Sequence, residues 1–193
     1  MSTKLILSST SQYRRQLLQR LHIPFSCHSP SIDESPLINE SPEHLVARLA
    51  LAKAQVISQR DKDAVVIGSD QIALLDKRII GKPGSKLAAT EQLLACSGKA
   101  IQFYTGLAVC CQNTEFQRVH IELFTVHFRP LTNSTIERYL DLEQPYDCAG
   151  SFKCEGLGIA LFSKMQGNDP TSLQGLPLIA LTSILPLAGI KVI

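Results

Sequence analysis

The 193-residue chain has little net charge and few cysteine patterns that could bind metal. Its 19 Lys and Arg are offset by 17 Asp and Glu, giving a formal charge of +2. Proteins that bind a nucleic-acid polymer usually carry a basic excess, so we expect no such partner and only a local basic site. The six cysteines include no C-x-x-C pair, and the five histidines lie far from zinc-ligand spacing. Cys110 and Cys111 are neighbours on an expected strand, so they point to opposite faces and are poorly placed for joint ligation.

Long apolar runs are also scarce. Near the N-terminus only three apolar residues follow Lys4, which is too short for the core of a signal peptide. The apolar stretch 176–193 is interrupted by Pro177, Pro186 and Lys191. A buried closing helix is the preferred interpretation of this stretch, and a membrane anchor is the weaker one. With reduced thiols, these features predict a cytoplasmic protein that does not associate with a membrane.

Three common catalytic motifs are missing. The chain contains no G-x-x-x-x-G-K-[ST] phosphate loop, and Gly156-Leu157-Gly158 lacks the third glycine of a dinucleotide-binding fingerprint. It also has no G-x-S-x-G elbow. Kinases, P-loop ATPases, dehydrogenases and the usual serine hydrolases are therefore disfavoured.

Hydrophobic periodicity predicts alternating strands and helices. Expected strands are 5–7, 23–27, 64–67, a hairpin over 72–80, a long hairpin formed by 101–111 and 116–129, and 157–162. Expected helices begin at Ser11, Ser41, Ser85 and either Thr132 or Ser134, followed by the closing helix. We predict an α/β fold with a mixed, elongated β-sheet flanked by helices, arranged as two lobes with a central cleft. Residues 1–193 are expected to form one functional domain.

Hydroxyl and guanidinium groups gather at the start of the first predicted helix. Residues 8–11 read Ser-Ser-Thr-Ser, and Arg14 and Arg15 follow within the first turn. Helix N-termini bind anions through exposed amide groups, so this segment predicts a phosphate site. The alternative, in which the hydroxyls only cap the helix and the arginines face solvent, stays open.

Lys53 lies in the middle of the apolar stripe of the second predicted helix, between the Leu45/Leu49 and Val46/Ala50 rows. A lysine there either extends its head group to solvent or meets a carboxylate or a phosphate. We favour a carboxylate or phosphate partner for the ammonium group of Lys53.

Three further residues suit phosphate chemistry. Asp70 follows a buried strand and Gly68-Ser69, which places a carboxylate where α/β sheets bind ligands, although it could serve only the turn. Glu34, on a proline-bearing loop, could join Asp70 in binding Mg²⁺. Lys82, between Gly81 and Pro83, is a candidate phosphate contact or a solvated turn lysine.

The motifs taken together resemble the Maf family of nucleotide pyrophosphatases over almost the whole chain. The matching segments are Leu5–Ser11 with Arg14-Arg15, Asp33-Glu34, Lys53, Gly68-Ser69-Asp70, Gly81-Lys82-Pro83, Tyr104-Thr105-Gly106 and Gly175-Leu176-Pro177-Leu178.

The resemblance implies hydrolysis of a nucleoside triphosphate between the α and β phosphates, with a divalent cation, Mg²⁺ or Mn²⁺, as cofactor. It assigns triphosphate contacts to Ser9, Arg14, Arg15, Lys53 and Lys82. It assigns metal binding to Glu34 and Asp70, with Asp70 also accepting the proton of the attacking water. The resemblance further suggests a homodimer.

Three positions separate substrate classes within this family, namely Tyr13, Gln71 and Glu155. Gln71 and Glu155 resemble the subgroup that cleaves 7-methyl-GTP, as do Cys148–Lys153 and Asn168–Pro170. An aromatic face attracts the positive charge of N7-methylated guanine, and a carboxylate accepts hydrogen bonds from the guanine edge. That subgroup usually has Trp where this chain has Tyr13, so weaker stacking is expected.

Two alternatives remain. The first is a pyrophosphatase for dTTP and UTP or for a broader set of non-canonical nucleotides. The second is a nucleotide-binding regulator of septum formation that does not depend on turnover.

Overall fold

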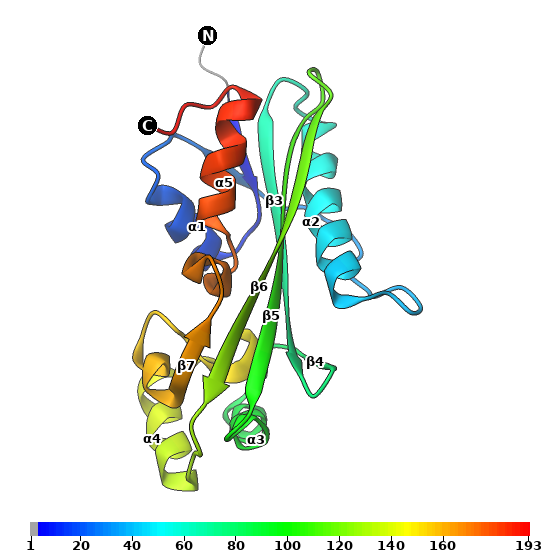
Figure 1. The fold of residues 1–193 in the computed structure, drawn as a ribbon. Coiled ribbons are helices and arrows are strands. Elements are labelled where there is room, and N and C mark those ends of the chain that lie inside the picture. Colours follow the sequence, from blue (N-terminus) through cyan, green and yellow to red (C-terminus); the bar gives the residue numbers. More distant parts are fainter. Residues whose placement is uncertain (1–3) are drawn as a thin grey trace. The chain divides into compact units, whose positions relative to one another are not determined.

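The computed structural model describes residues 4–193 and has the predicted mixed α/β fold (Figure 1). Over these residues, seven strands form one sheet in the order β2-β1-β3-β5-β6-β7, with β4 paired to β3. The strands are β1 Leu5–Ser8, β2 Ser26–His28, β3 Val65–Leu75, β4 Arg78–Ile80, β5 Ala100–Cys111, β6 Phe116–Phe128 and β7 Phe162–Gln166. The α-helices are α1 Gln12–Gln19, α2 Pro42–Ser58, α3 Lys86–Cys96, α4 Asn133–Glu143 and α5 Leu178–Ile184. Short 3₁₀ helices are η1 Ala149–Ser151, η2 Leu157–Leu161, η3 Pro170–Gln174 and η4 Leu185–Ala188.

The chain divides into two compact units. The first contains the described residues up to Gln71, together with 104–122 and 169–193. The second contains 72–103 and 123–168. Strands β3, β5 and β6 therefore contribute residues to both units.

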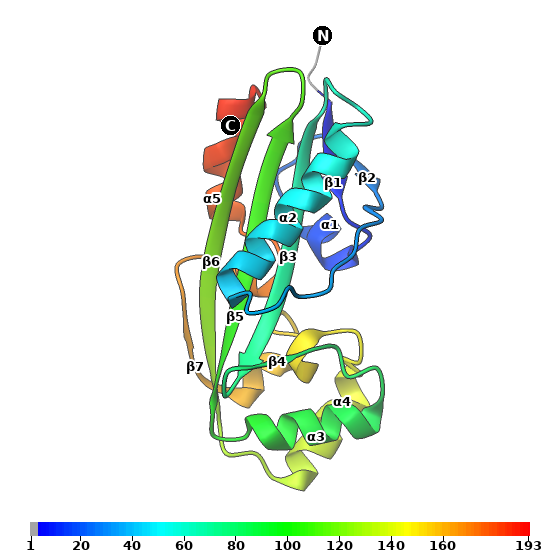
Figure 2. The ribbon, with the colours of Figure 1, turned by 90° about the vertical axis from the view of Figure 1, so that its right-hand side faces the viewer.

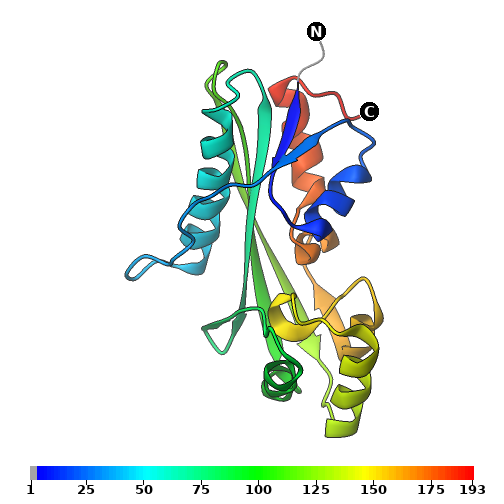
Figure 3. The ribbon, with the colours of Figure 1, turned by 180° about the vertical axis from the view of Figure 1, so that it is seen from behind.

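Alternating apolar side chains give the first unit a core on each face of its sheet. Leu7 and Ile67, which are register partners on parallel strands β1 and β3, pack with Leu17 of α1 and Leu181 of α5. Figure 3 shows α1 and α5 on this side. Their neighbours in sequence, such as Ile6 and Val66, face α2 on the other side, where α2 lies along β3 (Figure 2). Cys111 belongs to the first core and Cys110 to the second, which confirms their predicted opposite orientation.

Two glycines allow α2 to lie directly on the sheet. A Cβ atom at Gly68 would come within 2.2 Å of the Ala50 carbonyl oxygen, and one at Gly106 within 2.2 Å of the Val46 carbonyl oxygen. Neither position has room for a side chain, so the backbone of α2 is in contact with β3 and β5. This contact places Lys53, on the inner face of α2, close to the part of β3 that carries Asp70.

The second unit is closed by aromatic packing. Phe152 packs edge-on against Phe103, Phe128 and Phe162, with ring centroids 4.8–5.7 Å apart. Such edge-to-face contacts add specificity to apolar burial. They join the residue that follows η1 to strands β5, β6 and β7 within the unit.

Most predicted boundaries are confirmed. Ser41, Ser85 and Thr132 each cap their helix by accepting a backbone N–H, at 3.3, 3.3 and 3.2 Å. The hairpin turn at Asp76-Lys77 is present, with both residues at positive φ. The strand expected at 23–27 is shifted to Ser26–His28.

Three further sequence predictions were wrong in detail. The strand expected at 157–162 is mostly the 3₁₀ helix η2, because Glu143 accepts the Leu157 N–H at 2.7 Å and Gly158 lies against the backbone of Lys153. The closing helix is short: α5 ends at Ile184 and continues only as η4, since Pro186 has no N–H to extend an α-helix. The strand expected to end at Ile67 runs on to Leu75 as β3. None of the helices among residues 4–193 is long and apolar enough to cross a membrane.

We predict that Gly68→Ala destabilises the protein, because the added methyl group must displace the backbone of α2. Overpacking of this kind costs about 1–3 kcal/mol in the free energy of unfolding, which urea denaturation measures. Gly81→Ala is the matched control, since a Cβ atom there meets nothing within 4 Å. Equal stability of the two variants would show that the α2 contact is not tight.

Candidate active site

The first unit contains a buried lysine held between two carboxylates. Lys53 Nζ lies 2.7 Å from Asp70 Oδ1 and 2.8 Å from Glu34 Oε1. The side chains of Lys53 and Asp70 are only 6% and 8% exposed, whereas that of Glu34 is 57% exposed. One end of the cluster is therefore enclosed and the other is open to solvent. Lys53 meets carboxylate partners, as the sequence predicted, instead of extending to solvent.

Packing and register position the two buried members of this cluster. Ser8, the last residue of β1, pairs with Gly68 on β3 and donates a hydrogen bond from Oγ to the Lys53 carbonyl oxygen at 2.6 Å. Because β3 continues past the end of β1, Asp70 lies just beyond the carboxyl end of β1 and not at the end of its own strand. This corrects the predicted strand end but keeps Asp70 at the expected edge of the parallel pair.

Hydrogen bonds within the loop and from α2 hold the loop that carries Glu34. Asp33 accepts the Ser35 N–H at 2.9 Å, a hydrogen bond that lowers the pKa of Asp33. Arg48 of α2 donates to the Ser35 carbonyl oxygen at 3.1 Å and forms a bidentate pair with Glu40 at 2.6 and 2.7 Å. This pair lowers the pKa of Glu40 to about 2. The sequence analysis did not identify Arg48 or Glu40, whose only signal was opposite charge on a loop and the helix after it.

Arg14 is a cationic member of the same region, and Ser9 is its hydrogen-bond partner. Arg14 Nε donates to the Gly175 carbonyl oxygen at 2.8 Å, and its Nη1 donates to Ser9 Oγ at 3.5 Å. Desolvation lowers the pKa of Arg14, and the negative charges of Asp70 and Glu34 oppose that shift. The structure thus brings the charges of Arg14, Asp70 and Glu34 into mutual influence.

Arg15 has different neighbours from Arg14. It is exposed and lines a cavity of about 460 Å³ together with Gln19 and residues 23–27. Adjacent helix positions point about 100° apart, so Arg14 and Arg15 face different surroundings. Arg15 as a triphosphate contact, which the family resemblance implies, stays a prediction.

Gln71 and Tyr13 also lie in the first unit. Gln71 Nε2 donates to the Ser172 carbonyl oxygen at 2.7 Å and lies 2.9 Å from Thr105 Oγ1 and 3.3 Å from the Leu173 carbonyl oxygen. Tyr13 is half-buried on α1. Neither Ser172 nor Thr105 was predicted from the sequence to hold Gln71.

Lys82 and Glu155 belong to the second unit. Lys82 is exposed in the turn between β4 and α3, where Gln92 Nε2 donates to the Gly81 carbonyl oxygen at 3.1 Å. Glu155 is exposed and lies 3.4 Å from the Cys154 thiol through Oε2. Their participation in the site remains a prediction.

The carboxylates suit a magnesium-type ion whose other ligands come from substrate. Within residues 4–193 no group of three or more His, Cys, Asp or Glu side chains could hold a metal alone. Mg²⁺ commonly uses one or two carboxylates and completes its octahedron with water and phosphate oxygens. Glu34 and Asp70 provide such a pair, since both reach the same ammonium group.

Known proteins resemble this chain over nearly its full length. A family model described as Maf-like protein matches residues 4–187. The 7-methyl-GTP pyrophosphatase of Pseudoalteromonas atlantica is 56% identical, over 94% of this chain and 93% of the relative. That of Vibrio cholerae is 52% identical, over 98% of each. A HAM1 protein from Coxiella burnetii is similar in fold, with a TM-score of 0.53 at 13% identity over 96% of this chain and 99% of the other.

We predict strong energetic coupling between Lys53 and Asp70. Lys53→Met leaves a buried carboxylate without its counter-charge and should lower the free energy of unfolding by about 3 kcal/mol. The double variant with Asp70→Asn removes both charges, so its loss should be smaller than the sum of the single losses by about 1 kcal/mol or more. Urea denaturation of the four proteins measures this difference.

The exposed pair Lys86–Asp141 is the matched control, with side chains 49% and 56% exposed. Its coupling should stay below about 1 kcal/mol, because solvent screens exposed pairs. Additive losses at Lys53 and Asp70 would mean that the buried pair contributes nothing of its own.

Proposed function

We propose that this chain, which belongs to the family of Maf-like proteins, hydrolyses nucleoside triphosphates between the α and β phosphates. The products are a nucleoside monophosphate and pyrophosphate, and 7-methyl-GTP is the leading substrate. The names of relatives more than half identical to the chain support this substrate. The single structural observation that carries the proposal is the buried Lys53 ammonium group joined to Glu34 and Asp70.

Five residues of the first unit have proposed roles in this reaction. Arg14 and Lys53 neutralise the phosphate oxygens, and Ser9 keeps the guanidinium of Arg14 in place. Lys53 bonds Asp70 through Oδ1, so we assign acceptance of the water proton to Oδ2. Glu34 and Asp70 bind Mg²⁺ or Mn²⁺. When bound, that ion polarises the phosphate and the attacking water.

The residues that face the base are proposed from chemistry and family resemblance. Tyr13 stacks on the positively charged methylated guanine, and Gln71 and Glu155 accept hydrogen bonds from its edge. Lys82 and Arg15 are proposed as further phosphate contacts.

The setting of the protein is also a proposal. All six cysteines are free thiols, which fits the reducing cytoplasm. We propose that the enzyme works there as a homodimer on a small-molecule substrate, with no nucleic-acid polymer and no membrane as partner.

A substrate panel tests the proposed function. With Mg²⁺ or Mn²⁺ present, purified protein should release pyrophosphate from 7-methyl-GTP with a higher kcat/KM than from GTP, ATP, dTTP or UTP. The monophosphate should appear in equal amount, because only the α–β bond breaks. If dTTP or UTP were turned over faster than 7-methyl-GTP, that nucleotide would be the leading substrate instead. Release of inorganic phosphate would contradict α–β cleavage.

Asp70→Asn should lower turnover strongly while nucleotide still binds. The amide keeps the shape of the carboxylate but loses its charge and its proton acceptor, so kcat should fall about 10³-fold. Pyrophosphate release measures turnover, and calorimetry measures nucleotide binding. Asp141→Asn, an exposed site in the second unit, is the control. A cell-division phenotype that depends on the protein and is unchanged in Asp70→Asn would favour the regulatory alternative.

A further inference from the structure

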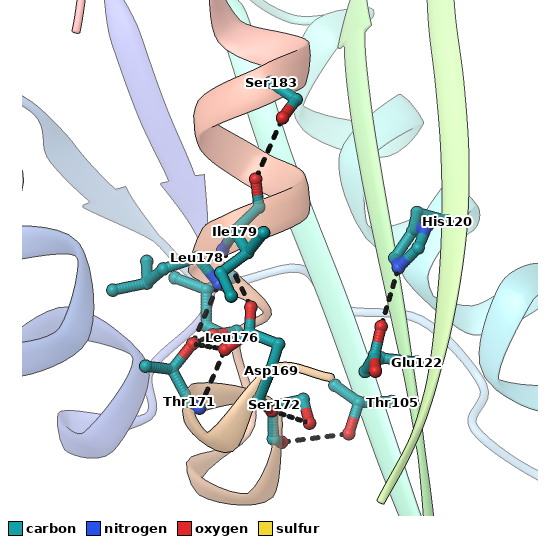
Figure 4. A network of polar contacts seen from close by, with 10 residues as sticks. All are labelled: Thr105, His120, Glu122, Asp169, Thr171, Ser172, Leu176, Leu178, Ile179 and Ser183. Atoms are coloured by element: carbon teal, nitrogen blue, oxygen red, sulfur yellow. Dashed lines mark hydrogen bonds and ion pairs between the residues drawn. The ribbon is translucent and has the colours of Figure 1, made fainter. Parts of the chain in front are cut away.

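Asp169 is a buried carboxylate outside the Lys53 cluster, and its hydrogen bonds join two ends of one segment. It is only 2% exposed. Its Oδ1 accepts the Thr171 N–H at 2.9 Å, and its Oδ2 accepts the Ile179 N–H at 2.7 Å (Figure 4). One side chain therefore spans ten residues, from the start of η3 to the first turn of α5.

Thr171 extends this arrangement. Its Oγ1 lies 2.6 Å from Asp169 Oδ1 and 2.9 Å from the Leu176 carbonyl oxygen, and it accepts the Leu178 N–H at 2.9 Å (Figure 4). Between these anchors the chain turns at Gly175, whose φ of +100° strongly favours glycine. Hydrogen bonds within segment 169–179 therefore hold its turn together.

This segment presents three carbonyl oxygens to the candidate site. Those of Ser172 and Leu173 face Gln71 Nε2, at 2.7 and 3.3 Å. That of Gly175 accepts from Arg14 Nε at 2.8 Å and lies 2.8 Å from Ser69 Oγ. Segment 169–179 therefore contacts the side chains proposed to bind base and phosphate.

The contacts also fix which way the Gln71 amide points. A carbonyl oxygen can only accept a hydrogen bond, so the NH₂ group of Gln71 must face the segment and Oε1 must face away from it. For a base that binds on that side, Oε1 is a hydrogen-bond acceptor. Guanine has N–H donors on its edge at N1 and N2, whereas adenine has a donor at N6 and an acceptor at N1. A hydrogen-bond acceptor that faces N1 and N2 therefore favours guanine over adenine.

We propose that Asp169 is a positioning residue for substrate selection. Its carboxylate holds segment 169–179 so that the Ser172 and Leu173 carbonyl groups orient Gln71 and the Gly175 carbonyl group orients Arg14. This rests on the proposed function, because it assumes that Gln71 and Arg14 contact the nucleotide.

The test compares Asp169→Asn with wild type. The NH₂ group of asparagine cannot accept an N–H, so one anchor of the segment is lost while side-chain size is kept. We expect KM for 7-methyl-GTP to rise about tenfold, with kcat changed less than about threefold, because Lys53, Glu34 and Asp70 hold one another in place and Arg14 keeps its hydrogen bond to Ser9. The ratio of kcat/KM for 7-methyl-GTP over that for ATP should fall about tenfold.

Two further variants separate positioning from loss of stability. In a Gln71→Ala background, Asp169→Asn should cause no further loss of base preference, since both act through the same amide. Ser41→Ala removes the cap of α2 in the same unit and should lower stability without changing the preference. Thr171→Val, which replaces the hydroxyl group with a methyl group, should reproduce the Asp169→Asn result and serves as the test if Asp169→Asn does not fold.

The possible failures are distinguishable in one assay. If wild-type protein releases no pyrophosphate from any nucleotide, the proposed function fails. If wild-type protein is active but Asp169→Asn keeps its base preference, the positioning role of Asp169 is wrong. The role is also wrong if Asp169→Asn lowers the base preference as much in the Gln71→Ala background as in the wild-type background.

Discussion

The need to compensate one buried ammonium group organises the candidate site. Lys53 lies on the inner, apolar face of α2, where an unpaired charge would be costly. It is tolerated because Asp70 from β3 and Glu34 from the loop before α2 both reach it. Three separate segments must therefore keep their relative positions for the charge to remain paired. The same requirement assembles a polar cluster with acidic and basic members, which is what cleavage of a phosphoanhydride needs.

The backbone supplies the precision that the flexible side chains lack. Gly68 and Gly106 bring α2 into contact with the sheet, and the hydrogen bond from Ser8 ties the Lys53 carbonyl group to the end of β1. Arg14, in turn, is held by the Gly175 carbonyl group. Lysine and arginine lose much rotamer entropy when they are ordered, so a scaffold that orders them before substrate arrives reduces the cost of binding. Glu34, at the solvent side, is the least enclosed member of the cluster.

The sequence was most informative where a local rule decides the structure. The alternation of side chains along a strand predicted that Cys110 and Cys111 face opposite sides of the sheet. Capping residues predicted the starts of α2, α3 and α4. The buried partner of Lys53 followed from its place on an apolar stripe. Long-range contacts were less predictable. The extension of β3 beyond Gly68-Ser69 depends on pairing with β4 and on α2 lying over the glycine, and the turns of η2 depend on Glu143. The different surroundings of Arg14 and Arg15, and the carbonyl groups that hold Gln71, also required the folded chain.

A crystal structure with Mg²⁺ and a 7-methyl-GTP analogue that cannot be cleaved between the α and β phosphates would test the central claim most directly. The account predicts that the triphosphate binds at Arg14 and Lys53, with the metal ion shared between the phosphates and the carboxylates of Glu34 and Asp70. A nucleotide bound elsewhere, with Lys53 still bridging both carboxylates and no metal beside them, would contradict it.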